Sequence, residues 1–468
     1  MRIDYRSSLF LGNRISTNVT YLMSAFFIYS VYKPYLSLKV FGLDEVHYYS
    51  SFTFKLLEEG RWLNYILHDV LRMFPIESWG ILLISLSFLL FYGLLPVSKI
   101  PNEIRILFAT SIVVSPPFVE QSLWPATTLP SIAVIFVLSL IQEKIRFQYI
   151  YVLAGIFLFG GMQNLYFMTP LLFIHKLIEN SDKHIKFRIL LDHAIWWILG
   201  CIIGVLISLV MVYIVTGQLG LNVAPWRKSQ PIHDLSSALN NISLMKIYFF
   251  DNVKLLLSKG GFTLSIIILT LSLSINLVIN RNYLLILIAT TSVAVSYFAF
   301  SVPLAPVIQT RTLLPFSAAV VFMFILLNRS KLMTIFNAIN MMYFCSVFTL
   351  YSANYINEHK SVTSFFYNKI ENLLDRNINY FDAFILKGKI PEDKRYAYFF
   401  NSAPLMHSIM YSLGAKSFWD CREGSTDSRC QTLLNLAPVN VTDIEGGKLI
   451  LLTDVDQKLA VLQFSMAD

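Results

Sequence analysis

Two long, largely apolar runs constrain the fold of this chain more than any other feature. Residues 195–215 and 262–279 are each close to the ~20 residues that an α-helix needs to cross about 30 Å of hydrocarbon. Of the 468 residues, 55% are hydrophobic and 14% are charged, whereas soluble domains carry about 25% charged residues. The sequence therefore predicts a polytopic helical membrane protein.

The same apolar pattern recurs along the first three quarters of the chain. We expect about eleven spans, at roughly 15–37, 77–96, 104–121, 127–141, 148–162, 164–179, 191–215, 262–280, 283–301, 312–328 and 332–352. Lysines and arginines fall mostly in the loops on one side of these spans, which the positive-inside rule makes cytoplasmic, together with the N-terminus. Because these basic residues orient the protein in the membrane, the net charge of +8 does not indicate nucleic-acid binding, and we expect no nucleic-acid partner.

An odd number of spans places the C-terminal residues outside. We divide the chain into a transmembrane domain, 1–352, with interfacial helices in the 38–76 loop, and an extracytoplasmic α/β domain, 353–468. The second domain is expected to hold two helices and two strands, at 362–374, 403–413, 380–386 and 449–452.

Two cysteines lie nine positions apart in the C-terminal domain. Cys421 and Cys430 could close a short disulfide loop in an oxidising compartment. The alternative is two unrelated thiols.

The first long outer loop, 38–76, concentrates charge in a chain that has little. Apolar residues recur at helical spacing over 46–57 and again over 63–71, and Gly60 separates the two patterns. We expect two amphipathic helices that lie in the membrane interface. Ionisable residues at membrane depth are costly, so the charges of this loop indicate a functional site.

Asp44 and Glu45 stand directly before the first of these helices. Carboxylates at that position commonly cap free N–H groups and meet the positive end of the helix dipole. Alternatively, one is a general base whose partly desolvated carboxylate takes a proton from an acceptor hydroxyl, with the other as its helper. His47 could hydrogen-bond a sugar or bind a metal, although a lone histidine more often does neither.

Arg61 and Trp62 lie beside Gly60, at the turn between the two interfacial helices. A guanidinium at headgroup depth suits bidentate phosphate binding, and the alternative is an arginine that snorkels to the interface. A helix of about fourteen residues would separate the acidic pair from Arg61 by roughly 20 Å. On that geometry Arg311 is the better phosphate ligand, and Arg61 anchors the loop.

Further polar residues occur in short outer turns that otherwise carry few charges. Glu120 lies in the proline-rich stretch 115–130, and Gln163 lies at the next outer turn. Gln309 and Arg311 lie in a late outer turn, where a basic residue departs from the orientation rule. Each is a candidate to bind substrate, with turn formation, helix capping or interfacial anchoring as the alternative.

These features together resemble the GT-C membrane glycosyltransferases, and more narrowly the bacterial serotype-converting O-antigen glucosyltransferases. The resemblance is carried by architecture along most of the chain. At residue level it rests on Asp44-Glu45, on Gly60-Arg61-Trp62 and on the Ser115-Pro116-Pro117 turn. It implies a mainly α fold, a transmembrane helical bundle with a small C-terminal α/β domain in the periplasm.

The resemblance also implies a reaction. Such enzymes lie in the bacterial inner membrane, take a glucosyl group from undecaprenyl-phosphate glucose and add it to an O-antigen sugar of lipopolysaccharide. A carboxylate of the first outer loop is catalytic, which here is Asp44 or Glu45. Direct displacement needs a single base, and we expect no metal and no cofactor.

Two other functions remain open for a chain of this pattern. An O-antigen polymerase would act on related substrates and would be expected to rely on arginines in large outer loops. A flippase or transporter of lipid-linked sugars would tend to have related halves and charges at mid-membrane. The charges here cluster at the outer rim instead.

Overall fold

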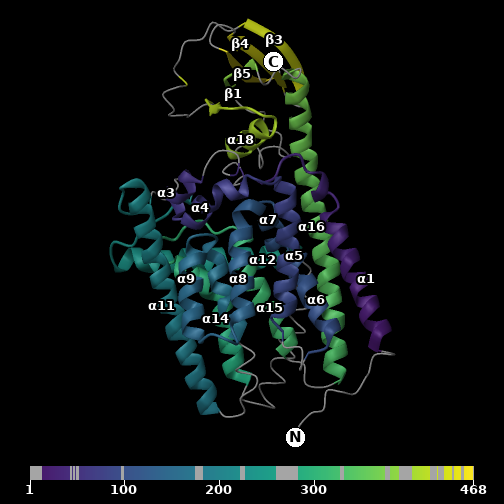
Figure 1. Cartoon of the computed structure of the whole chain (residues 1–468), viewed down its shortest axis with the longest axis vertical. Coiled ribbons are helices and arrows are strands. Elements are labelled where there is room, and N and C mark those ends of the chain that lie inside the picture. The colour runs from purple at the N-terminus through teal and green to yellow at the C-terminus, as the bar shows by residue number, and fades with distance from the viewer. Residues whose placement is uncertain are drawn as a thin grey trace. The chain divides into compact units, whose positions relative to one another are not determined.

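The structure is a computed structural model that describes residues 13–42, 45, 48, 52–95, 100–173, 183–221, 227–259, 283–326, 331–374, 380–388, 403–421, 430, 437–444, 447–454 and 458–466. These residues are mainly helical, with one small sheet (Figure 1). The chain divides into two units. The first consists of Met1–Tyr32 and Ser51–Asn354, and the second consists of Lys33–Ser50 and Tyr355–Asp468. Residues 33–50 therefore belong with the C-terminal residues, whereas the apolar pattern predicted that they belong to the 1–352 domain.

Helices build the first unit. The described elements are α1 (Asn13–Tyr32), α3 (Thr53–Glu59), α4 (Trp62–Leu71), α5 (Ile76–Gly93), α6 (Asn102–Val113), α7 (Pro116–Ser122), α8 (Pro125–Ile141), α9 (Phe147–Phe159), the 3-10 helix η3 (Gln163–Phe173), α11 (Lys183–Thr216), α12 (Leu235–Lys259), α14 (Tyr283–Ser301), the 3-10 helix η5 (Thr310–Leu313), α15 (Leu314–Leu326) and the part of α16 (Lys331–Leu374) that ends at Asn354.

Two of the described helices are long and apolar enough to cross a membrane. They are α5, over Ile76–Gly93, and α11, over Phe187–Thr216. The helices α7 and α8 form a third candidate, a pair bent by 118° that is either one broken span or a re-entrant loop. The described residues thus support a membrane protein, but they do not confirm all of the expected spans, and the predicted span 262–280 lies outside them.

Prolines explain where the expected spans break. The predicted span 104–121 is wrong as one helix, because α6 ends at Val113 and α7 begins at Pro116. Proline lacks the N–H that a helix interior needs, but it suits the first helical position, where α8 has Pro125. The predicted span 164–179 likewise begins as the 3-10 helix η3, which contains Pro170.

Glycines bring α9 and α11 close together (Figure 1). A Cβ at Gly155 would overlap the backbone of Gly200, and a Cβ at Gly204 would overlap the backbone of Gly155. Gly200 and Gly204 are four residues apart, so both lie on one face of α11. Small residues at this spacing let membrane helices pack backbone against backbone.

A five-stranded mixed sheet, in the order β2-β1-β5-β4-β3, organises the second unit. Its strands are β1 (Ala383–Gly388), β2 (Phe418–Asp420), β3 (Ala437–Ile444), β4 (Gly447–Asp454) and β5 (Leu459–Met466). Strand β1 pairs in parallel with β2 and β5, whereas β3, β4 and β5 form an antiparallel meander.

The predicted α/β character of this unit is confirmed, and its elements are close to those expected. The predicted strand 380–386 is β1, which begins three residues later, and the strand 449–452 lies within β4. The predicted helix 403–413 is α18 (Ala403–Ser412), and 362–374 is the end of α16. Strands β2, β3 and β5 were not predicted from the sequence.

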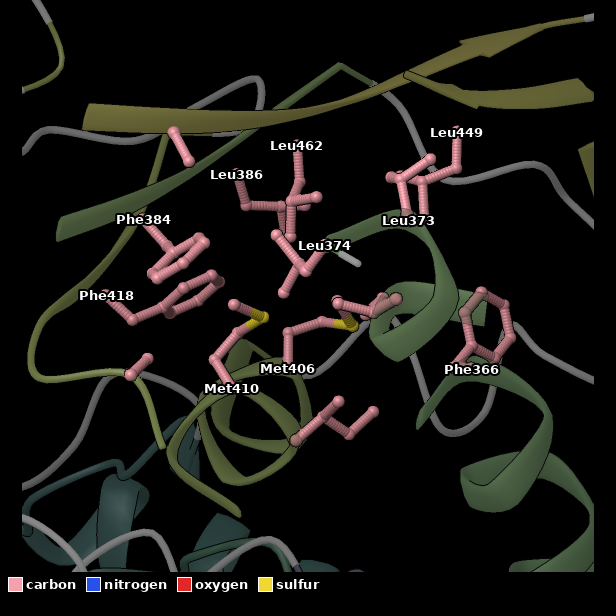
Figure 2. Close-up of a cluster of buried hydrophobic side chains, with 14 of the residues drawn as sticks. Phe366, Leu373, Leu374, Phe384, Leu386, Met406, Met410, Phe418, Leu449 and Leu462 are labelled. Carbon is pink, nitrogen blue, oxygen red and sulfur yellow. The ribbon is translucent and has the colours of Figure 1, made fainter. Parts of the chain in front are cut away.

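The core of the second unit lies between the sheet and two helices. Figure 2 shows Phe384 and Leu386 of β1 and Leu462 of β5 facing Met406 and Met410 of α18, with side chains of α16 beside them. Each such side chain contributes roughly 1.5–3 kcal/mol when fully buried.

The second unit also contains a short covalent crosslink and the segment 33–50. Cys421 and Cys430, the pair considered in the sequence, are joined by a disulfide with a Cα–Cα distance of 5.3 Å. Val40 belongs to the same apolar core, and its carbonyl oxygen lies 3.2 Å from Nε2 of the buried His359. These contacts attach residues 33–50 to the C-terminal residues.

Candidate functional site

The first unit contains a buried carboxylate at the end of a helix where carboxylates are disfavoured. Glu59 is the last residue of α3, and Gly60 ends the helix in the left-handed region, with φ of 69°. The carboxylate thus lies at the negative end of the helix dipole. Only 5% of Glu59 is exposed, so water does little to stabilise the negative charge of its carboxylate. Such a position requires nearby cations.

Three basic side chains supply this compensation. Lys55, one turn earlier in α3, places Nζ 2.9 Å from Oε1 of Glu59. Arg227 places Nη2 2.7 Å from the same oxygen, and Nη2 of Arg61 pairs with Oε2. Three cations, Lys55, Arg61 and Arg227, therefore meet the carboxylate of Glu59.

The polar groups around this cluster are largely removed from water. Gln163, the first residue of η3, donates a hydrogen bond of 2.6 Å from Nε2 to the backbone oxygen of Glu59. Arg61 is 8% exposed. Its Nε and Nη1 atoms are buried and have no hydrogen-bond acceptor among the residues that the structure describes. Buried donors without an acceptor are costly, so these N–H groups are candidates to bind an anionic ligand.

The surroundings of Glu59 fix its ionisation. Burial alone would raise the pKa of this carboxyl group, but Arg61, Lys55 and Arg227 outweigh that effect and hold the pKa well below its usual range. Glu59 is therefore a carboxylate at neutral pH and a weak base. Its role is to hold the three cations together.

Arg227 reaches the cluster because two loops pair through their backbones. The carbonyl oxygen of Arg227 accepts a hydrogen bond of 3.0 Å from the amide of Val307, and the amide of Gln230 donates to the carbonyl oxygen of Leu304 at 2.7 Å. The segment before α12 is thereby fixed to the segment that follows α14.

A second polar group forms where α7 meets η5. The guanidinium of Arg311 lies 4.0 Å from the centre of the Trp124 ring, within the range of a cation–π contact. Gln121 donates from Nε2 to the backbone oxygen of Arg311 at 2.6 Å. Arg311 is therefore held by its backbone as well as by its side chain.

Tyr297 of α14 interacts with residues of both the Glu59 cluster and the Arg311 group. Its side chain interacts electrostatically with Arg227, Glu59 and Arg311, and it hydrogen-bonds Thr312. The structure thus places two of the predicted residues, Arg61 and Gln163, at the Glu59 cluster, and it places Arg311 within range of the same tyrosine.

Of the predicted catalytic pair, Asp44 and Glu45, the structure describes Glu45 alone. Asp44 and His47 lie outside the described residues. Glu45 is 1% exposed and belongs to the second unit, and its amide donates to the carbonyl oxygen of Gly42 at 3.1 Å. The predicted helix of about fourteen residues is also wrong in length, because α3 begins only at Thr53.

The remaining predicted residues have varied surroundings. Trp62 is 8% exposed, and its ring lies 5.9 Å from that of Phe157, so it packs in an apolar cluster. Glu120 lies on α7 and is partly buried. Gln309 precedes η5, and its carbonyl oxygen accepts a hydrogen bond of 2.7 Å from Oγ1 of Thr312.

Three residues of this cluster, Glu59, Lys55 and Arg227, were not predicted as site residues from the sequence. One signal was available, because two carboxylates directly before a helix-ending glycine oppose the helix dipole and need compensation. The identity of the partner from the distant loop, Arg227, carried no local signal.

Comparisons with protein-family models, curated proteins and solved structures find no match to the chain. Among the described residues, no group of three or more His, Cys, Asp and Glu side chains could hold a metal ion.

Proposed function

We propose that the chain is an integral-membrane glucosyltransferase. It moves a glucosyl group from undecaprenyl-phosphate glucose to an O-antigen sugar at the periplasmic face of the bacterial inner membrane. In this proposal the chain has the GT-C-like bundle of about eleven spans, a cytoplasmic N-terminus and a periplasmic C-terminal domain. The observation that carries the proposal is the contact of three basic side chains with the buried Glu59, in a chain with helices long and apolar enough to cross a membrane.

This cation cluster has the chemistry that a lipid-linked phosphate requires. Arginine presents a planar fork of N–H donors to phosphate oxygens, and lysine supplies a compact charge. Arg61 retains two buried nitrogen atoms without an acceptor in the described part of the chain. We assign Lys55, Arg61 and Arg227 to the phosphate of the donor, with Arg311 as a further ligand near Tyr297.

The proposed reaction is a direct displacement at the anomeric carbon. The acceptor hydroxyl forms a bond to this carbon while the bond from the carbon to the phosphate oxygen breaks. The hydroxyl proton passes to a carboxylate base. The donor, a phosphodiester with one negative charge, thus becomes a polyprenyl phosphate monoester with up to two, and the cations stabilise the charge that develops.

The base is proposed to be Asp44 or Glu45, on the sequence argument alone. Glu59 is a poor choice, because three cations engage its carboxylate and hold its pKa low. Glu120, Gln163, Gln309, His47 and Trp62 remain proposals for binding or positioning of the sugars.

Substitution tests these assignments. We expect Asp44→Asn or Glu45→Gln to lower glucosyl transfer by about 10²-fold or more, because a general base is lost. Arg227→Gln should lower transfer by about 10²-fold through loss of charge stabilisation. The exposed Arg72, changed to Gln, is the matched control and should retain activity. The measurement is transfer of labelled glucose to O-antigen in membranes with equal amounts of each variant.

Two outcomes would contradict the proposal. Full activity in both carboxylate variants would remove the assigned base. Expression in a strain with a suitable acceptor should also add glucose to the O-antigen, and an altered chain-length distribution without added glucose would indicate a polymerase instead.

A further inference from the structure

We infer that α12 is an interfacial helix, which lies in the plane of the membrane surface and inserts an apolar ridge into the phospholipids of the periplasmic leaflet. The ridge consists of four side chains that are each more than half exposed: Leu235, Leu239, Ile242 and Phe250. The inference takes the membrane-spanning bundle from the proposed function, but it does not depend on glucosyl transfer. It adds a lipid-binding surface to the chain.

Polar side chains of α12 contact the segment that joins two other helices. Asn241 donates from Nδ2 to the carbonyl oxygen of Val302, directly after α14, at 3.0 Å. Asn252 donates from Nδ2 to the carbonyl oxygen of Ile308, shortly before η5, at 3.4 Å. The two asparagines are separated by about 16 Å of helix, and both reach this short segment.

An aromatic contact places α12 at the ends of the same two helices. The ring of Phe249 lies 5.0 Å from that of Phe298, in the last turn of α14, and 5.9 Å from that of Phe316, in the first turn of α15. A helix alongside α14 would instead reach residues deep within it after about 16 Å. Therefore α12 lies across the helix ends, where the proposed bundle meets the membrane surface.

The exposed side chains of α12 divide into two faces. With 3.6 residues per turn, the ridge falls within a sector of about 80°. Ile247 lies in the next sector, whose other exposed side chains in the described part of the helix are polar: Ser236, Asn240, Ser243, Asp251 and Lys254. The third side holds the buried Asn241, Met245 and Asn252. A ridge between a protein-facing side and a polar side suits a helix that is half immersed in the interface.

The charges of α12 favour the interface over a spanning position. Lys246 is exposed within the sector of the ridge, and Asp251 and Lys254 are exposed on the polar face. Charged side chains are costly in the hydrocarbon of a membrane, so α12 is unsuited to span it. At the interface, the aliphatic stem of Lys246 lies along the ridge while its ammonium group reaches the phosphates of the lipids.

The face of α14 that contacts α12 identifies lipid as the occupant. Exposed apolar side chains lie on α14 within about 80° of Phe298 around the helix axis, at Leu284, Ile288 and Val295. In the proposed bundle α14 spans the membrane, so this face meets acyl chains. The ridge of α12 therefore lies next to the end of a lipid-facing surface and extends it into the interface.

The position of α12 also sets the depth of Arg227. Oδ1 of Asp234 accepts a hydrogen bond of 2.7 Å from the amide of Ser237, which fixes the start of α12. Before that start, the amide of Ile232 donates to the carbonyl oxygen of Pro303 at 3.2 Å. A helix fixed at the membrane surface thus holds Arg227 and its partner Glu59 near the headgroup plane, where a lipid-linked phosphate lies.

The experiment measures the depth of single fluorescent labels on the full chain in nanodiscs. Cys201 and Cys345, the free cysteines, are first changed to alanine, and the Cys421–Cys430 disulfide is kept. A bimane label on one introduced cysteine then reports quenching by three reagents. These are phospholipids brominated beside the headgroup, phospholipids brominated near the chain ends, and aqueous iodide.

Two labels on the ridge are compared with two on the polar face. At Leu239→Cys and Phe250→Cys, we expect the headgroup-proximal bromines to quench at least about twofold more than the chain-end bromines, because an interfacial helix buries its apolar face by only about 5–10 Å. The matched controls are Ser236→Cys and Lys254→Cys, where iodide should quench at least about threefold more than on the ridge.

A second measurement uses the unsubstituted chain. Phospholipids that carry a photoreactive diazirine beside the headgroup are activated in the nanodisc, and adducts are mapped by mass spectrometry. We expect adducts on Leu239, Ile242 and Phe250. Val441 of β3, which is as exposed as Phe250 but belongs to the second unit, should carry none.

Several results would overturn the inference. A spanning α12 would place the labels at 239 and 250 at depths that differ by about 16 Å. Quenching of the ridge by iodide alone would place it in water, and a ridge that neither lipid nor iodide reaches would be covered by another protein chain. Absence of ridge adducts on the unsubstituted chain would overturn it without any substitution.

The proposed function fails separately from this inference. A ridge at headgroup depth in a chain without any glucosyl transfer would leave the interfacial helix standing. Glucosyl transfer by a chain whose ridge lies in water would remove the interfacial helix alone.

Discussion

At the scale of single residues, Glu59 holds three basic side chains of the first unit together. It is a buried carboxylate at the unfavourable end of a helix, and it persists there because Lys55, Arg61 and Arg227 contact it. Removal of one partner from a buried ion pair costs more than the pair itself contributes, since the remaining charges stay buried. The four residues therefore act as a unit in stability.

We expect Glu59→Gln to lower the free energy of unfolding by about 3 kcal/mol or more. Glu77→Gln, at an exposed carboxylate in the first turn of α5, should cost less than about 1 kcal/mol. Thermal unfolding of the detergent-solubilised variants measures both. Equal melting temperatures for Glu59→Gln and the wild type would contradict the role of Glu59.

The contribution of Glu59 to the free energy of unfolding also depends on pH. Its pKa is lower in the folded chain than the ordinary glutamate value, which is about 4.3. Its contribution to stability is therefore present above that value and is lost as the pH falls through the lowered pKa. The difference between wild type and Glu59→Gln should be constant from about pH 8 to 5 and should shrink below about pH 4.

At the scale of elements, the contact of α9 with α11 depends on glycine. A Cβ at Gly200 would overlap the carbonyl oxygen of Tyr151, and the backbones of both helices would have to separate. Because α11 also contacts α3 and α4, a shift of α11 would disturb the elements that hold Lys55, Glu59 and Arg61.

We expect Gly200→Ala to destabilise the first unit by about 1–3 kcal/mol through overpacking. Gly93→Ala is the matched control. Nothing lies within 4 Å of a Cβ at Gly93, and alanine favours a helix by up to about 1 kcal/mol relative to glycine. Melting temperatures in detergent measure both changes, and a neutral Gly200→Ala would show that the two helices can separate without cost.

At the scale of the whole molecule, the chain consists of two units with different architecture. The first is helical and contains the candidate spans, and the second has a mixed sheet, an apolar core and the Cys421–Cys430 disulfide. Disulfides persist mainly in oxidising compartments. The disulfide thus supports the proposal that the second unit lies in the periplasm.

A reporter fused to the chain tests this location. We expect alkaline phosphatase fused after Asp468 to be active, because that enzyme needs an oxidising compartment. The same reporter inserted after Lys144, in a loop predicted to be cytoplasmic, should be inactive. The reverse pattern would show that the orientation is inverted.

The sequence by itself determined the features that depend on neighbouring residues. Apolar runs predicted a membrane protein, helical periodicity and Gly60 predicted α3 and α4 around a turn, and α18, β1 and β4 followed from local patterns. The tertiary structure alone decided which distant residues meet: Arg227 joins Glu59, and residues 33–50 join the C-terminal unit. The physical reason is that helix and strand patterns are written in adjacent residues, whereas a buried charge is compensated by whichever cation the packing brings near it.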